Sequence, residues 1–469
     1  MSERVRTLNP YVLLVVLSLG FIMAVLDTTG VVLAIPKIEQ GLTVSLNESL
    51  WILNGYILAL STFILLSGNL STKYGAKKTL LSGMGLFVIA SLACSLANSV
   101  LLLIVFRFLQ GLGAALFMPS SMAVLYRVFP DKKELAKVLG IWSTIISVAT
   151  GTGSFIGGTI IQLFGWRGVF LINVPIGLIT WLVVSFGVQE GDRNSNLKIN
   201  GLGNISLIGM IASLVIFLVE GNRFGYEQPG ILLFLVLFIV IGMIFFISEK
   251  KSNNPIFPIK LMSKAGFTVT NILGFLTNVS LYGLVLVLGL YFQQYLHLSS
   301  MISGLLILPG MTVLVIGNIY YTRVSGKYSS NKLALGSLWL TLIGALALFL
   351  ISFWMQPVPL WVIIVCFAVM SIGIGVLVPA STTILMITAG NEYSSMAGAT
   401  LNANKQLGGL LGTTIMGIVT ATLETQWISI ISWTFGINVL LYGIGLLLCW
   451  YYLIVNYSAM NDRASGNTE

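Results

Sequence analysis

Three ionisable side chains stand deep inside apolar stretches of the sequence, where a charge is costly. They are Asp27, Arg107 and Lys405, whereas the other acidic residues fall in loops, in tails or near the ends of such stretches. A charge at the centre of a bilayer costs about 2.5–3.5 kcal/mol on insertion scales, so groups of this kind are candidates for function. The chemistry open to them is proton binding, ion pairing and recognition of a charged substrate.

Asp27 is the strongest candidate for a proton-binding residue. It precedes Pro36 by nine residues, which places it about 13 Å from the outer end of its helix. A carboxylate at that depth loses hydration, so it can bind a proton on one side of the membrane and release it on the other, or pair with a cationic substrate. Two structural interpretations stay open: a salt bridge to Arg107, or hydrogen bonds to Thr28 or Thr29.

Arg107 and Lys405 are the cations that stand inside apolar stretches. Because a guanidinium keeps its charge, Arg107 needs acceptors or a water-filled cavity. Helical spacing puts it on one face with Gln110 and Gly111, and glycine allows a neighbouring helix to approach closely. Both cations are therefore candidates for a functional role. The alternatives are structural pairing for Arg107 and snorkelling of Lys405 toward the inner membrane surface.

The composition indicates which elements must position these groups. Of 469 residues, 57% are hydrophobic and only 8% are charged, whereas a soluble domain carries about 25% charged residues. The chain is therefore predicted to be an integral membrane protein. Its apolar runs of about twenty residues favour helices over the short alternating strands of a barrel, because the hydrocarbon core offers backbone groups no water.

Fourteen runs are long enough to span a membrane, and the connections between them are too short to hold a soluble domain. The runs are predicted at residues 11–35, 50–70, 80–96, 101–126, 138–164, 170–188, 202–219, 231–248, 267–296, 302–321, 333–353, 360–388, 397–423 and 428–455.

The distribution of basic residues predicts that both termini are cytoplasmic. With that orientation nineteen Lys and Arg residues lie inside, and only Lys37, Arg167 and Arg223 lie outside. The net charge of +9 then reflects inner loops that face anionic lipid, and we expect no nucleic-acid partner. Arg4 and Arg6 precede an apolar run as in a signal peptide, but no small-residue cleavage site follows, so we expect a retained first helix.

Other kinds of site are not indicated by the sequence. The single histidine, His297, and three widely separated cysteines exclude a metal cluster or a disulfide framework, and no nucleophile–base pair stands in the spans. We therefore expect neither an enzyme nor a bound metal. The glycine-rich stretch 151–158 lacks a preceding strand, so we interpret it as a helix-packing seam. A comparable seam is predicted at Gly408, Gly409 and Gly412.

Short motifs recur along nearly the whole chain. They are Leu26-Asp27-Thr-Thr in the first span, Gly68-Asn-Leu-Ser-Thr72-Lys73-Tyr-Gly75-Ala-Lys77-Lys78 after the second, Arg107-Phe-Leu-Gln110-Gly111 in the fourth, Gly153-Ser154-Phe-Ile-Gly157-Gly158 in the fifth, and Trp166-Arg167-Gly-Val-Phe170-Leu-Ile-Asn173 at the sixth. With these motifs the sequence resembles the major facilitator superfamily. More narrowly, it resembles the fourteen-helix drug:proton antiporter branch, which includes quaternary-ammonium and quinolone efflux pumps of Gram-positive bacteria.

The resemblance implies an all-α polytopic membrane protein with the major facilitator fold, in which two extra central helices stand between two six-helix bundles. The expected divisions are an N-terminal bundle at 1–190, two additional helices with linkers at 191–264, a C-terminal bundle at 265–457 and a cytoplasmic tail at 458–469. Substrate would bind between the bundles near the membrane midplane.

The resemblance also implies roles for single residues. Asp27 would bind the proton, and Arg107 and Lys405 would couple it to transport. Conformational roles fall to Gly68, Thr72, Lys73, Gly75, Lys77, Lys78, Gly153, Gly157 and Gly158. Thr72, Ser154 and Lys405 stand where the family usually has aspartate, proline and arginine. Candidate substrate contacts, each a residue type that more often serves packing, are Tyr56, Gln110, Met118, Gln293 and Asn402.

The predicted function is a proton-coupled multidrug efflux antiporter of the plasma membrane. We expect it to be a monomer, driven by the proton motive force without a cofactor, and surrounded by membrane lipid. One deep acid favours one proton per cycle, and hence monocationic or zwitterionic amphiphiles such as quinolones or dyes. Two alternatives stay open: a dedicated exporter of a metabolite, such as an amino acid or an envelope precursor, and a membrane sensor that transports nothing.

Overall fold

The structure, a computed structural model, describes residues 9–465 except 130, 191–192, 194–198, 253–254, 257–258 and 356. Every regular element in these residues is a helix. The elements are α1 (Pro10–Leu42), α2 (Leu46–Tyr74), α3 (Ala76–Leu96), α4 (Val100–Val128), α5 (Lys132–Phe164), α6 (Trp166–Leu171), α7 (Asn173–Gly187), α8 (Gly201–Phe224), α9 (Pro229–Lys251), the short η1 (Ile259–Ser263), α10 (Ala265–Leu290), the π-helical turn η2 (Tyr291–Tyr295), α11 (Ser300–Val324), α12 (Ser330–Trp354), α13 (Leu360–Leu423) and α14 (Trp427–Ser465).

The described helices provide fourteen stretches that are long and apolar enough to cross a membrane, and each corresponds to one predicted run. The prediction of fourteen spans is therefore confirmed. The sixth span consists of α6 and α7, which meet at Ile172. The twelfth and thirteenth are the two halves of α13, and Gly390 separates them with a φ of 71°, a conformation that glycine adopts at little cost.

Some predictions fall on residues that are not described. Arg4, Arg6 and Lys198, which contribute to the predicted orientation, lie outside the described residues, as do the first eight residues of the predicted N-terminal division. Helix α14 continues to Ser465, and residues 466–469 of the predicted tail lie outside as well.

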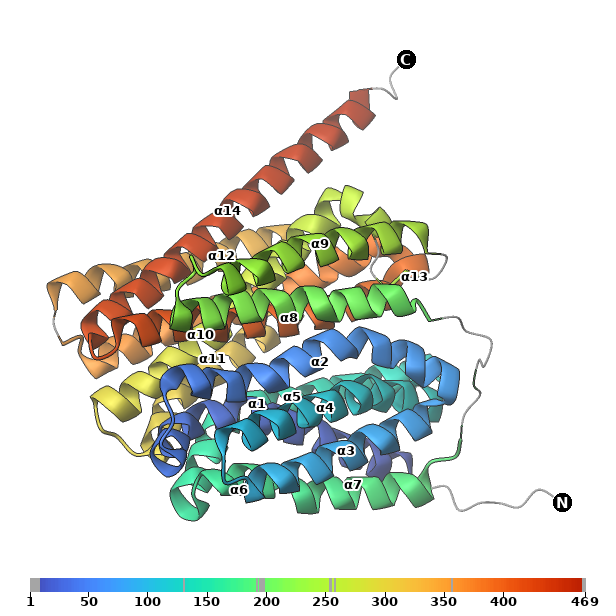
Figure 1. The fold of residues 1–469 in the computed structure, drawn as a ribbon. Coiled ribbons are helices and arrows are strands. Elements are labelled where there is room, and N and C mark those ends of the chain that lie inside the picture. Colours follow the sequence, from blue (N-terminus) through green and yellow to red (C-terminus); the bar gives the residue numbers. More distant parts are fainter. Residues whose placement is uncertain are drawn as a thin grey trace.

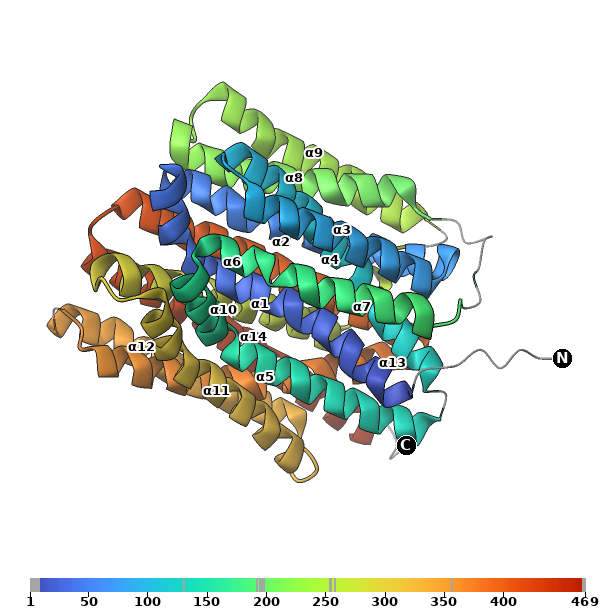
Figure 2. The same cartoon turned by 90° about the horizontal axis from the view of Figure 1, so that it is seen from below.

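The helices gather into two bundles, α1–α7 and α10–α14 (Figure 1). In the first bundle α2 and α3 pack against α4, and α1 packs against α5 and α7. In the second bundle α13 packs against α10, α11 and α12. The bundles meet where α5 packs against α11 and where α2 packs against α13, and α5 and α11 lie side by side in Figure 2.

The remaining two spans, α8 and α9, form a hairpin at the side of the α2–α13 contact. Helix α8 packs against both α2 and α13, so it touches both bundles, whereas α9 packs against α8. We call the end of the molecule at which α1 begins the terminal end, and the other the opposite end. In Figure 1 the terminal end is at the right, and α14 runs back toward it from the opposite end.

Small residues let the helix backbones touch. At the α5–α11 contact a Cβ atom on Gly158 would overlap the carbonyl oxygen of Ser300, and one on Gly304 would overlap that of Ser154. Inside the second bundle Gly412 is pressed in the same way against the carbonyl of Val279. The predicted packing seams at 151–158 and at Gly408–Gly412 are thereby confirmed, as expected for helices in a bilayer.

Candidate functional site

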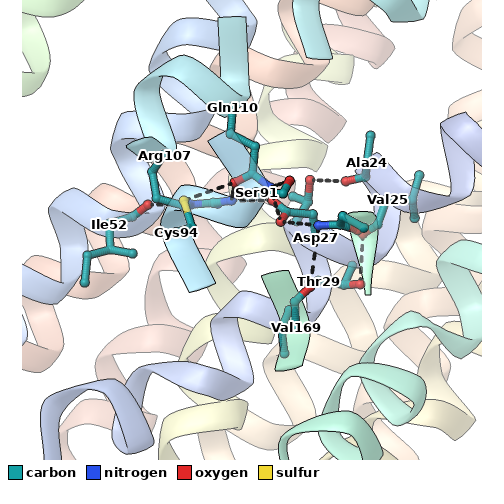
Figure 3. A network of polar contacts seen from close by, with 12 residues as sticks. Ala24, Val25, Asp27, Thr29, Ile52, Ser91, Cys94, Arg107, Gln110 and Val169 are labelled. Carbon is teal, nitrogen blue, oxygen red and sulfur yellow. Dashed lines mark hydrogen bonds and ion pairs between the residues drawn. The ribbon is translucent and has the colours of Figure 1, made fainter. Parts of the chain in front are cut away.

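The Asp27 carboxylate and the Arg107 guanidinium form an ion pair inside the first bundle (Figure 3). Each residue is only 1% exposed. Arg107 Nη1 donates hydrogen bonds to Asp27 Oδ2 and, at 2.7 Å, to Gln110 Oε1, and Arg107 Nε donates to the Ile52 carbonyl at 3.0 Å. One guanidinium therefore connects the helices α1, α2 and α4.

The second carboxylate oxygen of Asp27 is held by two side-chain amides. Gln110 Nε2 donates to Asp27 Oδ1 at 2.9 Å and also to Ser91 Oγ at 2.8 Å. Asn173 Nδ2, from the first residue of α7, donates to the same Oδ1 at 3.3 Å. The carboxylate thus accepts hydrogen bonds from three side chains, which offsets the cost of burying its charge.

Aromatic rings cover the guanidinium. The Arg107 Cζ atom lies 4.3 Å from the centroid of the Tyr56 ring and 5.6 Å from that of Phe170. Such cation–π contacts strengthen when water is excluded. The hydroxyls of Thr28 and Thr29 donate instead to the carbonyls of their own helix, at Ala24 and Val25. Of the interpretations left open for Asp27, the structure therefore contains the ion pair to Arg107.

The local sequence explains how these groups meet. Arg107 and Gln110 are three residues apart on α4 and so share a face. A Cβ atom on Gly111 would overlap the Tyr56 carbonyl oxygen, which means that glycine allows the α2 backbone to lie directly against α4. This approach brings the Ile52 carbonyl within reach of Arg107.

The glycines of the fifth-span motif lie between this site and the second bundle. Gly153 faces the Thr29 side chain and Gly157 faces the Gly30 backbone, so α5 packs against α1 within one turn of Asp27. The next residue, Gly158, faces Ser300 of α11. Helix α5 therefore contacts the helix that carries Asp27 on one side and the second bundle on the other.

The loop after α2 is fixed to its own bundle. Thr72 Oγ1 donates to the Gly68 carbonyl at 3.1 Å, Lys77 Nζ donates to the Ser185 carbonyl at 2.7 Å, and Lys78 forms an exposed 3.8 Å ion pair with Glu190. Lys73 lies over the ring of its neighbour Tyr74, and Gly75 turns the chain with a φ of 99°. The basic residues Lys77 and Lys78 thus hold the loop to the end of α7.

The structure brings together four predicted residues and leaves the others apart. Asp27, Arg107, Tyr56 and Gln110 form the site, and Met118 lies farther along α4 in the core of the same bundle. The remaining three, Gln293, Asn402 and Lys405, lie in the second bundle.

These three residues have other surroundings. Gln293, on η2, donates to the Gly289 carbonyl at 3.2 Å and accepts a 2.8 Å hydrogen bond from Ser300. Asn402 and Lys405, on the second half of α13, are exposed, and Asn402 donates to the carbonyl of Gly398 in its own helix.

Sequence comparison identifies the family. The family model described as Major Facilitator Superfamily matches residues 17–413 and 271–466 of the chain. The chain belongs to the major facilitator superfamily. This superfamily member is accordingly a multi-pass membrane transporter with fourteen candidate spans, and not an enzyme.

Its relatives include proteins named for drug resistance and, in the Drug efflux pump JefA of Mycobacterium tuberculosis, for efflux. The chain is 35% identical over 454 residues to the Methylenomycin A resistance protein of Bacillus subtilis, and the aligned region covers 96% of each chain. It is 36% identical over 403 residues to the protein of the same name from Streptomyces coelicolor, covering 86% of this chain and 84% of that one. The Multidrug resistance protein Stp of Mycobacterium tuberculosis is 26% identical over 416 residues, covering 89% and 76%.

Solved structures share the fold. A POT family transporter in complex with a thioalcohol-conjugated peptide superposes with a TM-score of 0.70 at 16% identity, over 95% of this chain and 96% of that one. At this identity the likeness concerns the fold alone.

Sequence reasoning missed two side chains of the site in this superfamily member. Asn173 is a polar residue within an apolar span and belongs to the motif that begins at Trp166, so a signal was present. Ser91 is one of many serines in the spans, and nothing in the sequence distinguishes it. The Ile52 carbonyl is a backbone group, which no side-chain pattern reveals.

Proposed function

We propose that this transporter is a proton-coupled efflux antiporter for amphiphilic, monocationic or zwitterionic small molecules, working by alternating access. The observation that carries the proposal is the buried Asp27–Arg107 ion pair. A carboxylate that is neutralised by a fixed cation can exchange that cation for a proton, which gives two states of different structure. The resistance named for several relatives, and the drug efflux named for the pump JefA of Mycobacterium tuberculosis, support export as the direction of transport.

The ion pair is connected to the contact between the bundles through α2. Protonation of Asp27 would remove the counter-ion of Arg107. It would thereby alter the hydrogen bond that Arg107 donates to the Ile52 carbonyl. Two residues farther along α2, Asn54 Oδ1 accepts a 3.1 Å hydrogen bond from Thr413 Oγ1 of the second bundle. A proton at Asp27 can therefore bias how the bundles meet.

We further propose that both termini are cytoplasmic. The basic residues Lys37, Arg167 and Arg223 lie toward the opposite end, and most others in the described chain lie toward the terminal end, as the positive-inside rule requires. Under this orientation the opposite end faces outside. A proton that enters from outside and leaves inside gains about 2.3 kcal/mol per 100 mV of membrane potential.

The first prediction concerns Asp27→Asn. Because this change removes the proton site and keeps the shape of the side chain, substrate-evoked proton flux should fall at least tenfold. The measurement is quenching of a pH-sensitive dye in proteoliposomes, with a monocationic dye, a quinolone, a dication and methylenomycin A as substrates. Asp131→Asn, at an exposed acid before α5, is the matched control and should behave as wild type. Robust dication export at neutral pH by Asp27→Asn would contradict the proposal.

A narrower exporter is the second candidate function. The relatives from Bacillus subtilis and Streptomyces coelicolor are both named for resistance to one antibiotic, methylenomycin A. A dedicated exporter would respond to one compound of the panel and would protect cells against that compound alone. A sensor without transport would show no substrate-evoked flux with any compound.

A further inference from the structure

A second acid, Glu39, lies where the two bundles meet at the opposite end. It follows Asp27 on α1 by twelve residues, about 18 Å along the helix. Glu39 Oε2 accepts a 2.9 Å hydrogen bond from Gln294 Nε2 of η2. Because η2 belongs to the second bundle, this hydrogen bond joins the two bundles directly.

Glu39 is partly exposed, but one oxygen of its carboxyl group is buried and the side chains beside that group are neutral. Its Oε1 atom is buried and completes no hydrogen bond, and the same is true of Ser49 Oγ. Ser49, fully buried on α2, and Gln294 are the polar side chains beside the carboxyl group, and only Gln294 donates a hydrogen bond to it. The protein groups around the carboxyl are therefore polar, but they provide no positive charge.

The charged and titratable groups of the surrounding elements are occupied elsewhere or face water. Lys37 of α1 and His297 after η2 are exposed. Glu48 of α2 is hydrogen-bonded to Ser45, Arg167 of α6 stacks on Trp166 and donates to the Ala97 carbonyl, and Tyr291 and Tyr295 of η2 stack on each other. Among the described residues no cation forms an ion pair with Glu39.

A carboxylate with a buried, unpaired oxygen and no cation beside it is costly, and protonation lowers the cost. When the bundles separate at this end, water hydrates the whole carboxyl group and the ionised form is favoured again. The contact also involves a π-helical turn, a feature frequent at functional sites because it displaces the helix ladder. The irregular turn is the element that presents Gln294 to α1.

We propose that Glu39 is a second proton-binding site, which takes up a proton from the solution at the opposite end as the bundles close there and returns it to the same solution as they open. This proton is not carried across the membrane. It therefore changes the balance between closed and open states with the pH of that solution and leaves the number of transported protons unchanged. The inference rests on the alternating-access cycle of the proposed function.

The size of the effect has a thermodynamic limit. One proton taken up on closure changes the ratio of closed to open molecules by at most tenfold per pH unit. The sign follows from the geometry: the closed contact favours the protonated acid, so lower pH favours closure.

The test measures closure directly on the full chain in lipid nanodiscs. Spin labels at Gln40→Cys and Gln426→Cys, exposed positions at the opposite end of different bundles, report the distance by double electron–electron resonance. The native cysteines Cys94, Cys366 and Cys449 are buried and can remain. All measurements use an Asp27→Asn background between pH 5 and 8.5, so that titration of Asp27 does not contribute.

In this background the closed-to-open ratio should rise as the pH falls, approaching tenfold per unit. Adding Glu39→Gln should abolish the response and keep the closed state populated at all pH values. Glu220→Gln is the matched control, since Glu220 lies at the same end but accepts its 2.6 Å hydrogen bond from Trp51 and not from the second bundle. This control should keep the full response.

A pH response that persists after Glu39→Gln, or that is absent before it, overturns the inference. Gln294→Leu supplies an independent variant: it keeps the acid, removes the donor from the other bundle, and should lower the closed fraction at every pH. Because the background lacks Asp27, these outcomes are independent of the proton-flux result. A failure of coupled transport and a failure of the Glu39 site are thus distinguishable.

Discussion

Arg107 holds three helices with one side chain. Its guanidinium donates to Asp27 of α1, to Gln110 of its own helix and to the Ile52 carbonyl of α2, while its flat face lies on the Tyr56 ring. A planar group with five donors can do this at once, whereas an ammonium on a flexible stem cannot. The residue therefore depends on the shape of arginine as well as on its charge.

The change Arg107→Lys tests this dependence. Lysine keeps the positive charge beside Asp27 but cannot bond the Ile52 carbonyl and stack on Tyr56 in the same position. Substrate-evoked proton flux in proteoliposomes should fall at least tenfold, although the chain should still be recovered in the membrane. Arg127→Lys is the control, because exposed Arg127 donates only to the carbonyls of Gln189 and Glu190 in the described structure. Equal loss in both variants would refute the argument.

The sequence predicts charged residues of the site better than neutral ones. Asp27 and Arg107 stand out because charge is rare in an apolar span, and spacing alone adds Gln110. Asn173 and Ser91 complete the network but are chemically unremarkable among the polar residues of the spans. The sequence does not single out Glu39, because an acid near a helix end costs little free energy to ionise unless another bundle covers it. Only the tertiary structure shows that cover.

At the scale of elements, glycine position decides which helices can touch. On α5, Gly158 faces the backbone of α11, whereas a Cβ atom on Gly140 would meet nothing within 4 Å. Gly158 is therefore needed for close helix packing, whereas Gly140 is not. Hydropathy predicts all fourteen spans because it reports burial in lipid, but it does not detect such contacts or the π-helical turn at η2.

The pair Gly158→Ala and Gly140→Ala tests the difference. The added methyl of Gly158→Ala would overlap the Ser300 carbonyl, and overpacking of this kind costs about 1–3 kcal/mol. The closed-to-open ratio reported by labels at positions 40 and 426 should fall about tenfold. Gly140→Ala should leave that ratio unchanged, since the methyl finds open space. An equal response of the two variants would contradict the assignment of Gly158 to the contact between bundles.

At the scale of the whole molecule, α8 joins the two bundles at the opposite end. Asn222 Nδ2 donates to Asn47 Oδ1 of α2 at 3.1 Å, and Asn222 Oδ1 accepts from Thr422 Oγ1 of α13 at 2.8 Å. One amide thus bridges a residue of each bundle. Helix α8, which the family resemblance predicts only as part of an insertion, is in this way part of the contact that closes this end.

Removal of the bridge by Asn222→Ala should favour the open state. The loss of about 1 kcal/mol of hydrogen bonding corresponds to a fivefold lower closed-to-open ratio, measured with the labels at positions 40 and 426. Glu227→Ala, an exposed change in the loop between α8 and α9, should have no such effect. If Asn222→Ala leaves the ratio at its wild-type value, α8 does not contribute to closure at this end.

The seam of Ser154, Gly158, Ser300 and Gly304 has a kinetic consequence. Relative motion of α5 and α11 disturbs few rotamers there, because at Gly158 and Gly304 the facing atoms belong to the backbone. Interlocked leucine or phenylalanine side chains would have to withdraw and repack at each step. The activation barrier for switching access from one side of the membrane to the other should therefore arise mainly from breaking the polar contacts of Asn54, Glu39 and Asn222. Sliding along the seam should contribute little to it.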